Sequence, residues 1–103
     1  MLSAASQVKH PYVTKRTGVC GGRPVIAGTR IPVWGIAGWS RKGYSAERLQ
    51  REIYPSLGLA EIYDALSYYH DHKEEIDRQV EENSLSLREA RRRQAQWRLS
   101  HFS

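Results

Sequence analysis

The densest group of side chains that could bind a metal ion lies in one short stretch. His70 and His72 flank Asp71 in the sequence. Glu74 follows His70 at the spacing of one helical turn. A common zinc site needs a further histidine or cysteine at a matching spacing, and the only cysteine, Cys20, lies far upstream. We therefore interpret the stretch as part of an aromatic-rich helix with an interfacial histidine, and we expect no metal ion and no cofactor.

The sequence offers no recognisable pairing of a nucleophile with a base. Nothing links Cys20 to a histidine, and no pair of carboxylates lies in a known pocket motif. A single cysteine cannot form an internal disulfide, which favours a reducing compartment. No apolar run is long enough to span a bilayer, and Met1 to His10 lacks the apolar core of a secretory signal. We expect a non-enzymatic, cytoplasmic protein without a membrane anchor.

Seven cationic side chains near the expected turns and helix starts could contact the phosphates of DNA. Such contacts position a protein on a duplex without reading its sequence. The candidate DNA-binding residues are Lys15, Arg16, Arg23, Arg30, Arg41, Lys42 and Arg48. Two of them have an alternative role. Gly21-Gly22-Arg23 could form a backbone nest for an anion, but a glycine turn between strands explains it better. Arg30 could bind a ligand, but a role in pinning its own turn is favoured.

The basic charge is concentrated in the last residues of the sequence. The formal net charge is +5. Residues 84–103 carry five arginines and one glutamate, whereas the other 83 residues carry 11 basic and 10 acidic groups. This charge distribution predicts that the arm binds an acidic partner, either a phosphate backbone or an acidic pocket on a protein.

Two short strands and three helices are expected to position these residues. Residues 12–15 and 23–27 are rich in β-branched and aromatic types and are separated by glycines. The first helix is expected from Val33 to Lys42, with Gly43 just past its end as a left-handed cap.

Two glycines inside the first helix predict close packing. Gly35 and Gly38 each weaken a helix by about 1 kcal/mol relative to alanine. We therefore expect a neighbouring group to pack closely against the face that they form.

The second and third helices have clear boundary signals. Ser45 is a good N-cap for the second helix, which should stop near Tyr54, because the residue before a proline resists helical geometry. The third and longest helix should begin after Gly58 and run to about Glu82 or Asn83. Its apolar stripe is continuous only in the first half. We expect the charged far half to project from the body or to pack on a partner.

Four motifs together resemble the bacterial family known as domain of unknown function 433. They are Gly21-Gly-Arg-Pro-Val-Ile-Ala-Gly-Thr-Arg-Ile-Pro-Val33, Gly43-Tyr-Ser45, Tyr54-Pro-x-Leu57 and Ala65-Leu-x-Tyr-Tyr69. The resemblance covers roughly residues 12 to 75. One position departs from the pattern, because Gly58 stands where Ser or Thr is expected as a helix cap, at a cost of a few tenths of a kcal/mol.

The resemblance implies a mainly α-helical fold with a small N-terminal β-element and a three-helix, helix-turn-helix-like bundle. We divide the chain into a flexible N-terminus (1–11), this domain (12–83) and a basic C-terminal arm (84–103). A recognition helix would then begin at residue 59. Its exposed face would carry Glu61, Asp64, Tyr68 and Asp71. Because carboxylates repel phosphates, a plain three-helix core without DNA contact is the favoured alternative.

The resemblance also implies a function. Such proteins are similar to antitoxins of type II toxin–antitoxin pairs, which form homodimers, neutralise a PIN-type ribonuclease and bind operator DNA. A stand-alone DNA-binding transcriptional regulator is one alternative. Another is a structural adaptor that binds a protein through Trp34, Trp39 and tyrosine-rich surfaces.

The C-terminal arm lies outside the resemblance, and three interpretations of it remain open. It could lie on nucleic acid with Trp97 stacked on a base. It could instead enter the acidic metal site of the toxin, with arginines on carboxylates and apolar anchors beside them. The candidate toxin-binding residues are Arg88, Arg91, Arg92, Trp97, Leu99 and Phe102. The third possibility is a solvated basic end.

Overall fold

A small antiparallel sheet begins the fold. In the computed structural model, which describes residues 9–84, β1 (Val13–Thr14) pairs with β2 (Val25–Ile26), and Val13 lies opposite Ile26. The short 3₁₀ turn η2 (Cys20–Gly22) lies in the connection between them. The two strands lie within the predicted segments but are shorter, since Pro24 has no N–H to extend the ladder on the second strand.

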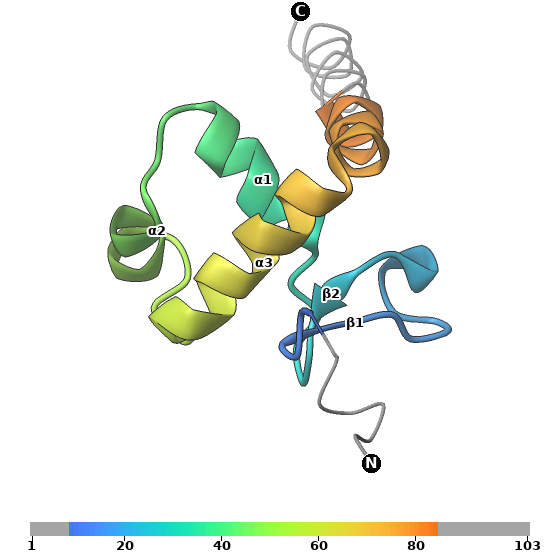
Figure 1. Cartoon of the computed structure of the whole chain (residues 1–103), viewed down its shortest axis with the longest axis horizontal. Helices are drawn as coiled ribbons and strands as arrows, with labels where there is room; N and C mark the ends of the chain where they lie inside the picture. The colour runs from blue at the N-terminus through green and yellow to red at the C-terminus, as the bar shows by residue number, and fades with distance from the viewer. Residues whose placement is uncertain (1–8, 85–103) are drawn as a thin grey trace, which may run out of the picture.

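Three labelled helices follow, each beginning where the sequence predicts (Figure 1). They are α1 (Val33–Arg41), α2 (Ala46–Glu52) and α3 (Leu59–Asp71). The Ser45 side chain caps α2 by accepting a hydrogen bond from the backbone N–H of Arg48 at 3.1 Å. The prediction of Ser45 as the cap is therefore confirmed.

Gly58 precedes α3 at the position where the sequence lacks a capping side chain. Glu61 compensates in part, because its carboxylate accepts a hydrogen bond from the backbone N–H of Gly58 at 2.8 Å. This is one half of a capping box, and it also places a negative charge in the first turn of the helix.

The prediction of one continuous third helix to Glu82 or Asn83 is wrong. The helix ends at Asp71, His72 adopts φ −130° and ψ 45°, and residues 73–84 form a separate helix. Figure 1 shows this segment, in orange, leaving the direction of α3. The break turns Ile76 into the core, where its side chain is fully buried. Within the described residues the far half therefore packs on the body, and it does not project from it.

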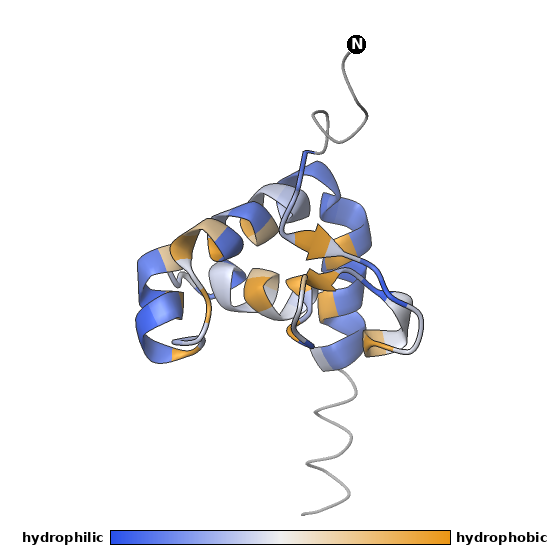
Figure 2. Cartoon of the chain, turned by 90° about the horizontal axis from the view of Figure 1, so that it is seen from below, coloured by the Kyte–Doolittle hydropathy of each residue, from blue (hydrophilic) through white to orange (hydrophobic). Residues whose placement is uncertain are grey.

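The core lies between α1, α2, α3 and the sheet, and the helix at residues 73–84 closes it. Its buried side chains include Ile26, Val33, Ile36, Leu49, Leu57, Ile62, Ala65, Tyr69 and Ile76. Figure 2 shows hydrophobic positions on the inner sides of the elements and hydrophilic positions outside. The architecture is mainly α-helical with a small N-terminal β-element, as predicted. No helix of the described part of the chain is long and apolar enough to cross a membrane.

The close packing predicted from the two glycines of α1 is confirmed at Gly35, whereas Gly38 has an ordinary contact. A Cβ atom at Gly35 would lie 3.2 Å from the Tyr54 hydroxyl oxygen. One at Gly38 would lie 3.8 Å from a methyl group of Val80. The second neighbour is on the helix at residues 73–84, so this face of α1 receives that helix.

Candidate functional site

The histidine-rich stretch does not form a metal site among the described residues. No group of three or more His, Cys, Asp or Glu side chains in residues 9–84 is placed to hold a metal ion. The expected helical face shared by His70 and Glu74 does not exist, because α3 ends between them. The His72 ring instead packs against Tyr68, with 4.1 Å between the ring centres.

The N-terminal segment covers the face of α3 that was expected to be exposed. The Tyr12 N–H donates a hydrogen bond to Asp64 at 2.7 Å, and the His10 Nε2 atom lies 2.9 Å from an oxygen of Asp71. The Asp64 side chain is only 12% exposed. The expectation that this residue faces solvent is wrong, because residues distant in sequence pack on it. Glu61 and Tyr68, expected on the same face, are also partly buried, and only Asp71 remains exposed.

The contact with His10 also changes the acidity of Asp71. The hydrogen bond from His10 is the largest cause that lowers the pKa of the Asp71 carboxyl below its usual value. His10, in the segment expected to be flexible, is thereby tied to α3. A recognition helix could reach bases with this face only after this N-terminal contact had opened.

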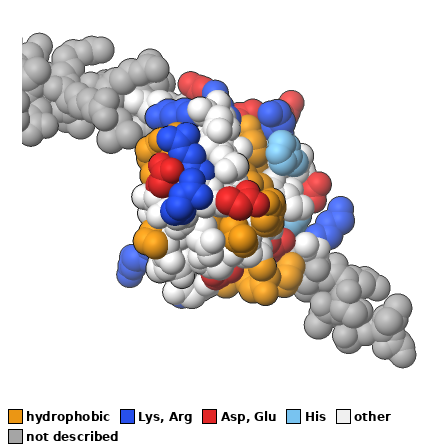
Figure 3. Space-filling view, turned by 90° about the vertical axis from the view of Figure 1, so that its left-hand side faces the viewer, with side chains coloured by type: hydrophobic (Ala, Val, Ile, Leu, Met, Phe, Trp, Pro, Cys, Tyr) orange, Lys and Arg blue, Asp and Glu red, His pale blue; other side chains and the backbone are white. Residues whose placement is uncertain are grey.

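The cationic residues predicted to contact DNA are mostly engaged within the chain. Four pair with carboxylates: Lys15 with Glu75 at 3.9 Å, Arg23 with Glu82 at 3.4 Å, Arg41 with Glu81 at 2.9 Å and Arg48 with Glu52 at 3.2 Å. Arg16 donates to the carbonyl of Thr29 at 3.2 Å, and the Lys42 ammonium lies 5.1 Å from the centre of the Trp39 ring. Figure 3 shows Lys and Arg side chains interspersed with carboxylates on the face it presents. Six of the seven residues are thus engaged by other groups of the described chain.

The turns that carry Arg23 and Arg30 are held by hydrogen bonds that do not involve these two side chains. At the glycine turn, the N–H groups of Gly22 and Arg23 donate to the carbonyls of Val19 and Cys20 at 2.9 and 3.2 Å, so two donors of the proposed nest are already used. In the next turn, the Thr29 hydroxyl donates to the Ile26 carbonyl at 2.8 Å and accepts from the backbone N–H of residue 31 at 3.0 Å.

These contacts decide two of the interpretations made from the sequence. The glycine turn is confirmed over the anion nest. Within the second turn the Thr29 side chain makes the hydrogen bonds, the Arg16 side chain donates to the turn from outside, and the Arg30 side chain is exposed. The favoured structural role of Arg30 is therefore wrong.

The candidate toxin-binding residues of the C-terminal arm lie outside the described residues. These are Arg88, Arg91, Arg92, Trp97, Leu99 and Phe102. The described chain ends at Ser84, the first residue of that arm.

An apolar groove of about 350 Å³ lies between α1 and the helix at residues 73–84. Aromatic rings dominate it: Trp34 and Trp39 come from α1, and Tyr54 follows α2. The remaining lining residues are Pro32, Gly35, Gly38, Lys42, Val80, Asn83 and Ser84. The break at His72 makes this groove, because it brings the helix at residues 73–84 beside α1.

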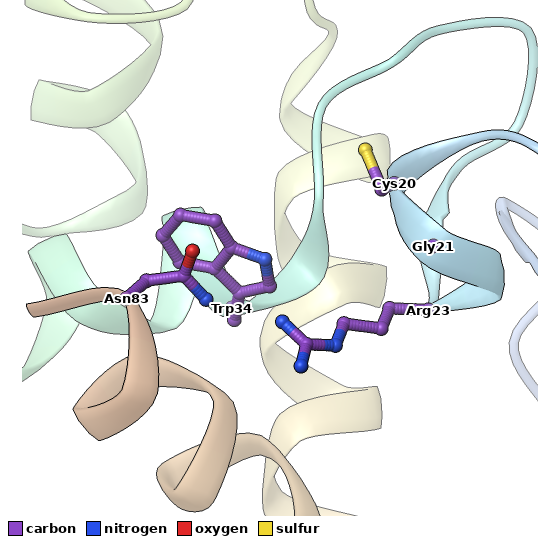
Figure 4. Close-up of a pocket in the computed structure, with 5 residues that line it drawn as sticks. All are labelled: Cys20, Gly21, Arg23, Trp34 and Asn83. Carbon is purple, nitrogen blue, oxygen red and sulfur yellow. The ribbon is translucent and has the colours of Figure 1, made fainter. Parts of the chain in front are cut away.

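A second hollow of about 360 Å³ adjoins the groove. It is lined by Cys20, Gly21, Arg23, Trp34 and Asn83. Figure 4 shows Arg23 extending its guanidinium from the η2 segment toward the α1 segment that carries Trp34. Because Trp34 and Asn83 line both hollows, the two form one continuous surface with Trp34 between them.

Local contacts hold the aromatic rings of the groove in place. Burial raises the pKa of the Tyr54 hydroxyl, against the opposite effect of a hydrogen bond with the Trp39 side chain. The Trp39 ring also packs edge-on against Tyr44, with 4.9 Å between ring centres. The hydroxyl therefore stays neutral at ordinary pH.

Sequence reasoning found only part of this groove. Trp34 and Trp39 were named as a protein-binding surface, and the glycines between them indicated close packing. Val80 and Asn83 were missed, because their position depends on the break at His72.

Three comparisons relate the chain to known proteins. It matches the family described as "Protein of unknown function (DUF433)" over residues 13–69. It is 39% identical over 67 residues to "Uncharacterized protein y4eO" of Sinorhizobium fredii, a match that covers 65% of this chain and 28% of that protein. The chain thus spans well under two thirds of that relative's length. It also resembles the crystal structure of a DUF433 member protein from Anabaena variabilis, with a TM-score of 0.62 and 33% identity, covering 74% of this chain and 73% of that one.

Proposed function

The chain belongs to the DUF433 family, and from this premise we propose that it is a non-enzymatic protein-binding module acting as the antitoxin of a type II toxin–antitoxin pair. The antitoxin class rests on the resemblance of the sequence motifs. The protein-binding part rests on one observation, which is the aromatic groove between α1 and the helix at residues 73–84. The proposed partner is a PIN-type ribonuclease, and the proposed assembly contains a homodimer of this chain.

The groove has the chemistry of a protein-interaction site. Tryptophan and tyrosine are enriched among the few residues that dominate binding energy at interfaces. Two of the three tryptophans of the chain, Trp34 and Trp39, line the groove together with Tyr54. The groove opens beside Ser84, where the basic arm begins, so one partner could contact both.

DNA binding is the less favoured function. Surface ion pairs contribute at most about 1 kcal/mol each, so phosphates could displace the carboxylates from the paired cations. However, the N-terminal segment covers α3 through Asp64 and Asp71. A DNA-binding role through this helix would need that segment to move, whereas the groove is already open.

The proposal is tested by co-expressing the chain with a neighbouring PIN-type ribonuclease and measuring growth and co-purification. We expect the wild type to restore growth and to bind the nuclease stoichiometrically. Trp34→Ala should weaken the complex by roughly thirtyfold or more, about 2 kcal/mol, as for an interface hot spot.

Tyr63→Ala is the matched control for loss of an aromatic ring. Tyr63 is 50% exposed and donates a hydrogen bond to Glu47, away from the groove-lining residues. This variant should restore growth like the wild type, and thermal melts should show that both variants fold. If folded Trp34→Ala binds the nuclease as tightly as the wild type, the groove is not the binding site. If the chain retains specific DNA and no nuclease, it acts as a DNA-binding regulator instead.

A further inference from the structure

We infer that the two hollows beside Trp34 form one docking site for an acidic amphipathic segment of the partner protein. This inference rests on the proposed function and specifies the chemistry of the partner at that same site. It comes from the continuity, the charge and the apolar lining of the two hollows.

The two hollows are parts of one site because they share residues. Trp34 and Asn83 line both, so the two hollows meet at these residues. A segment laid across Trp34 can place one side chain in each hollow. The rings of Trp39 and Tyr54 line one of these hollows, which suits an aliphatic or aromatic anchor.

The charge of the lining indicates which segment binds. The described residues that line the two hollows include the cations Arg23 and Lys42 and no Asp or Glu. Lys42 lies over the Trp39 ring and is not ion-paired with any described residue. Carboxylates on the docking segment would therefore meet one cation at each hollow.

Arg23 is available to a partner carboxylate despite its ion pair. It lies 3.4 Å from Glu82, and the two side chains are 36% and 52% exposed. Such a pair is weak in water, so a carboxylate delivered by a docked segment can share or replace this contact.

The same charges disfavour the chain's own arm as the occupant. Residues 84–103 carry five arginines and one glutamate. Like charges brought together at an interface are destabilising, so neither this arm nor that of a second copy matches the two cations. An acidic segment of another protein does.

Panning a phage library of random twelve-residue peptides against the full-length chain tests the inference. Peptides that also bind folded Trp34→Ala are removed beforehand. We expect the enriched peptides to combine Asp or Glu with Leu, Phe or Trp. Enrichment of arginine-rich peptides would indicate the chain's own arm or a second copy and would overturn the inference, as would a lack of enrichment.

Charge reversal then tests the two cations with a selected peptide. The double variant Arg23→Glu, Lys42→Glu should weaken binding by roughly tenfold or more. A peptide with lysine in place of its carboxylates should bind this double variant better than it binds the wild type. The control Arg51→Glu reverses a 68% exposed charge on α2, away from the lining residues, and should change binding little.

This experiment separates the inference from the proposed function. If Trp34→Ala weakens the nuclease complex but the double charge reversal does not, the docking segment is not acidic, and the antitoxin function stands. If acidic peptides bind and no nuclease does, the docking site stands and the antitoxin function fails.

Discussion

Gly35 and Gly38 lie on one face of α1 but have different neighbours, which predicts opposite outcomes for the same substitution. Alanine stabilises an exposed helix position by up to about 1 kcal/mol relative to glycine. At Gly38 the new methyl would make an ordinary contact with Val80 at 3.8 Å, so we expect Gly38→Ala to raise the free energy of unfolding by roughly 0.5–1 kcal/mol. Urea denaturation measures this change.

Gly35→Ala is the matched comparison. Its methyl would lie 3.2 Å from the Tyr54 hydroxyl, which must shift, and this cost offsets the gain in helix propensity. We expect no stabilisation, or a loss. Equal stabilisation by both variants would contradict the close contact between α1 and Tyr54.

Asp71 predicts how the fold responds to acid. The His10 hydrogen bond lowers the pKa of Asp71 in the folded state. A depressed carboxyl pKa contributes stability that is present above the unfolded-state pKa, near 3.9, and is lost as the pH falls through the folded value. Acidification from about pH 5 to about pH 2.5 should therefore lower the melting temperature of the wild type more than that of Asp71→Asn.

The control for this titration is Glu74→Gln. It removes the same charge from an exposed side chain on the neighbouring helix, so its acid response should match the wild type. An identical acid response in wild type and Asp71→Asn would show that His10 does not stabilise the carboxylate.

The break between α3 and the helix at residues 73–84 predicts a large effect at Ile76. This side chain is fully buried, and truncating a buried isoleucine to alanine costs about 2–5 kcal/mol. We expect Ile76→Ala to lose stability in this range by urea denaturation. Arg78→Ala, at an exposed position of the same helix, should change it by no more than about 0.5 kcal/mol. Similar small effects at both positions would indicate a helix that projects from the body.

Short sequence motifs such as helix caps predicted where the helices begin. Contacts between residues distant in sequence determined where the third helix ends. Ser45 marks the start of α2 because its side chain satisfies a backbone donor within the same turn. The break at His72 has no such signal, since neither proline nor glycine is present there. It is stabilised by tertiary contacts instead, namely the burial of Ile76 and a 2.6 Å hydrogen bond from the Tyr69 hydroxyl to Asp77.

The same limit applies to the candidate site. Trp34 was predicted as a surface for protein binding from its residue type alone. The groove around it requires Val80 and Asn83, which reach α1 only after the break. Helical periodicity likewise placed Asp64 on an exposed face, and it could not show that Tyr12, 52 residues earlier, would cover it.

The net positive charge of the chain lies mainly in residues 84–103. Outside residues 84–103 the chain carries 11 basic and 10 acidic groups, and several of these pair with each other across elements, such as Arg41 with Glu81 at 2.9 Å. The body is thus close to electrically neutral. Under the proposed function, the arm would supply the long-range attraction for an acidic partner, and the groove would supply the apolar contact.

This division predicts the outcome of removing residues 85–103. Every core residue of the described chain precedes that cut, and the last of them is Ile76, so the shortened chain should fold with nearly the melting temperature of the full chain. It should nevertheless fail to neutralise the nuclease in the growth assay, because the steering charge is gone. A full-length variant with Arg88, Arg91 and Arg92 replaced by alanine should fail in the same way. Neutralisation by the shortened chain at wild-type level would assign the whole interaction to the groove and none of it to the arm.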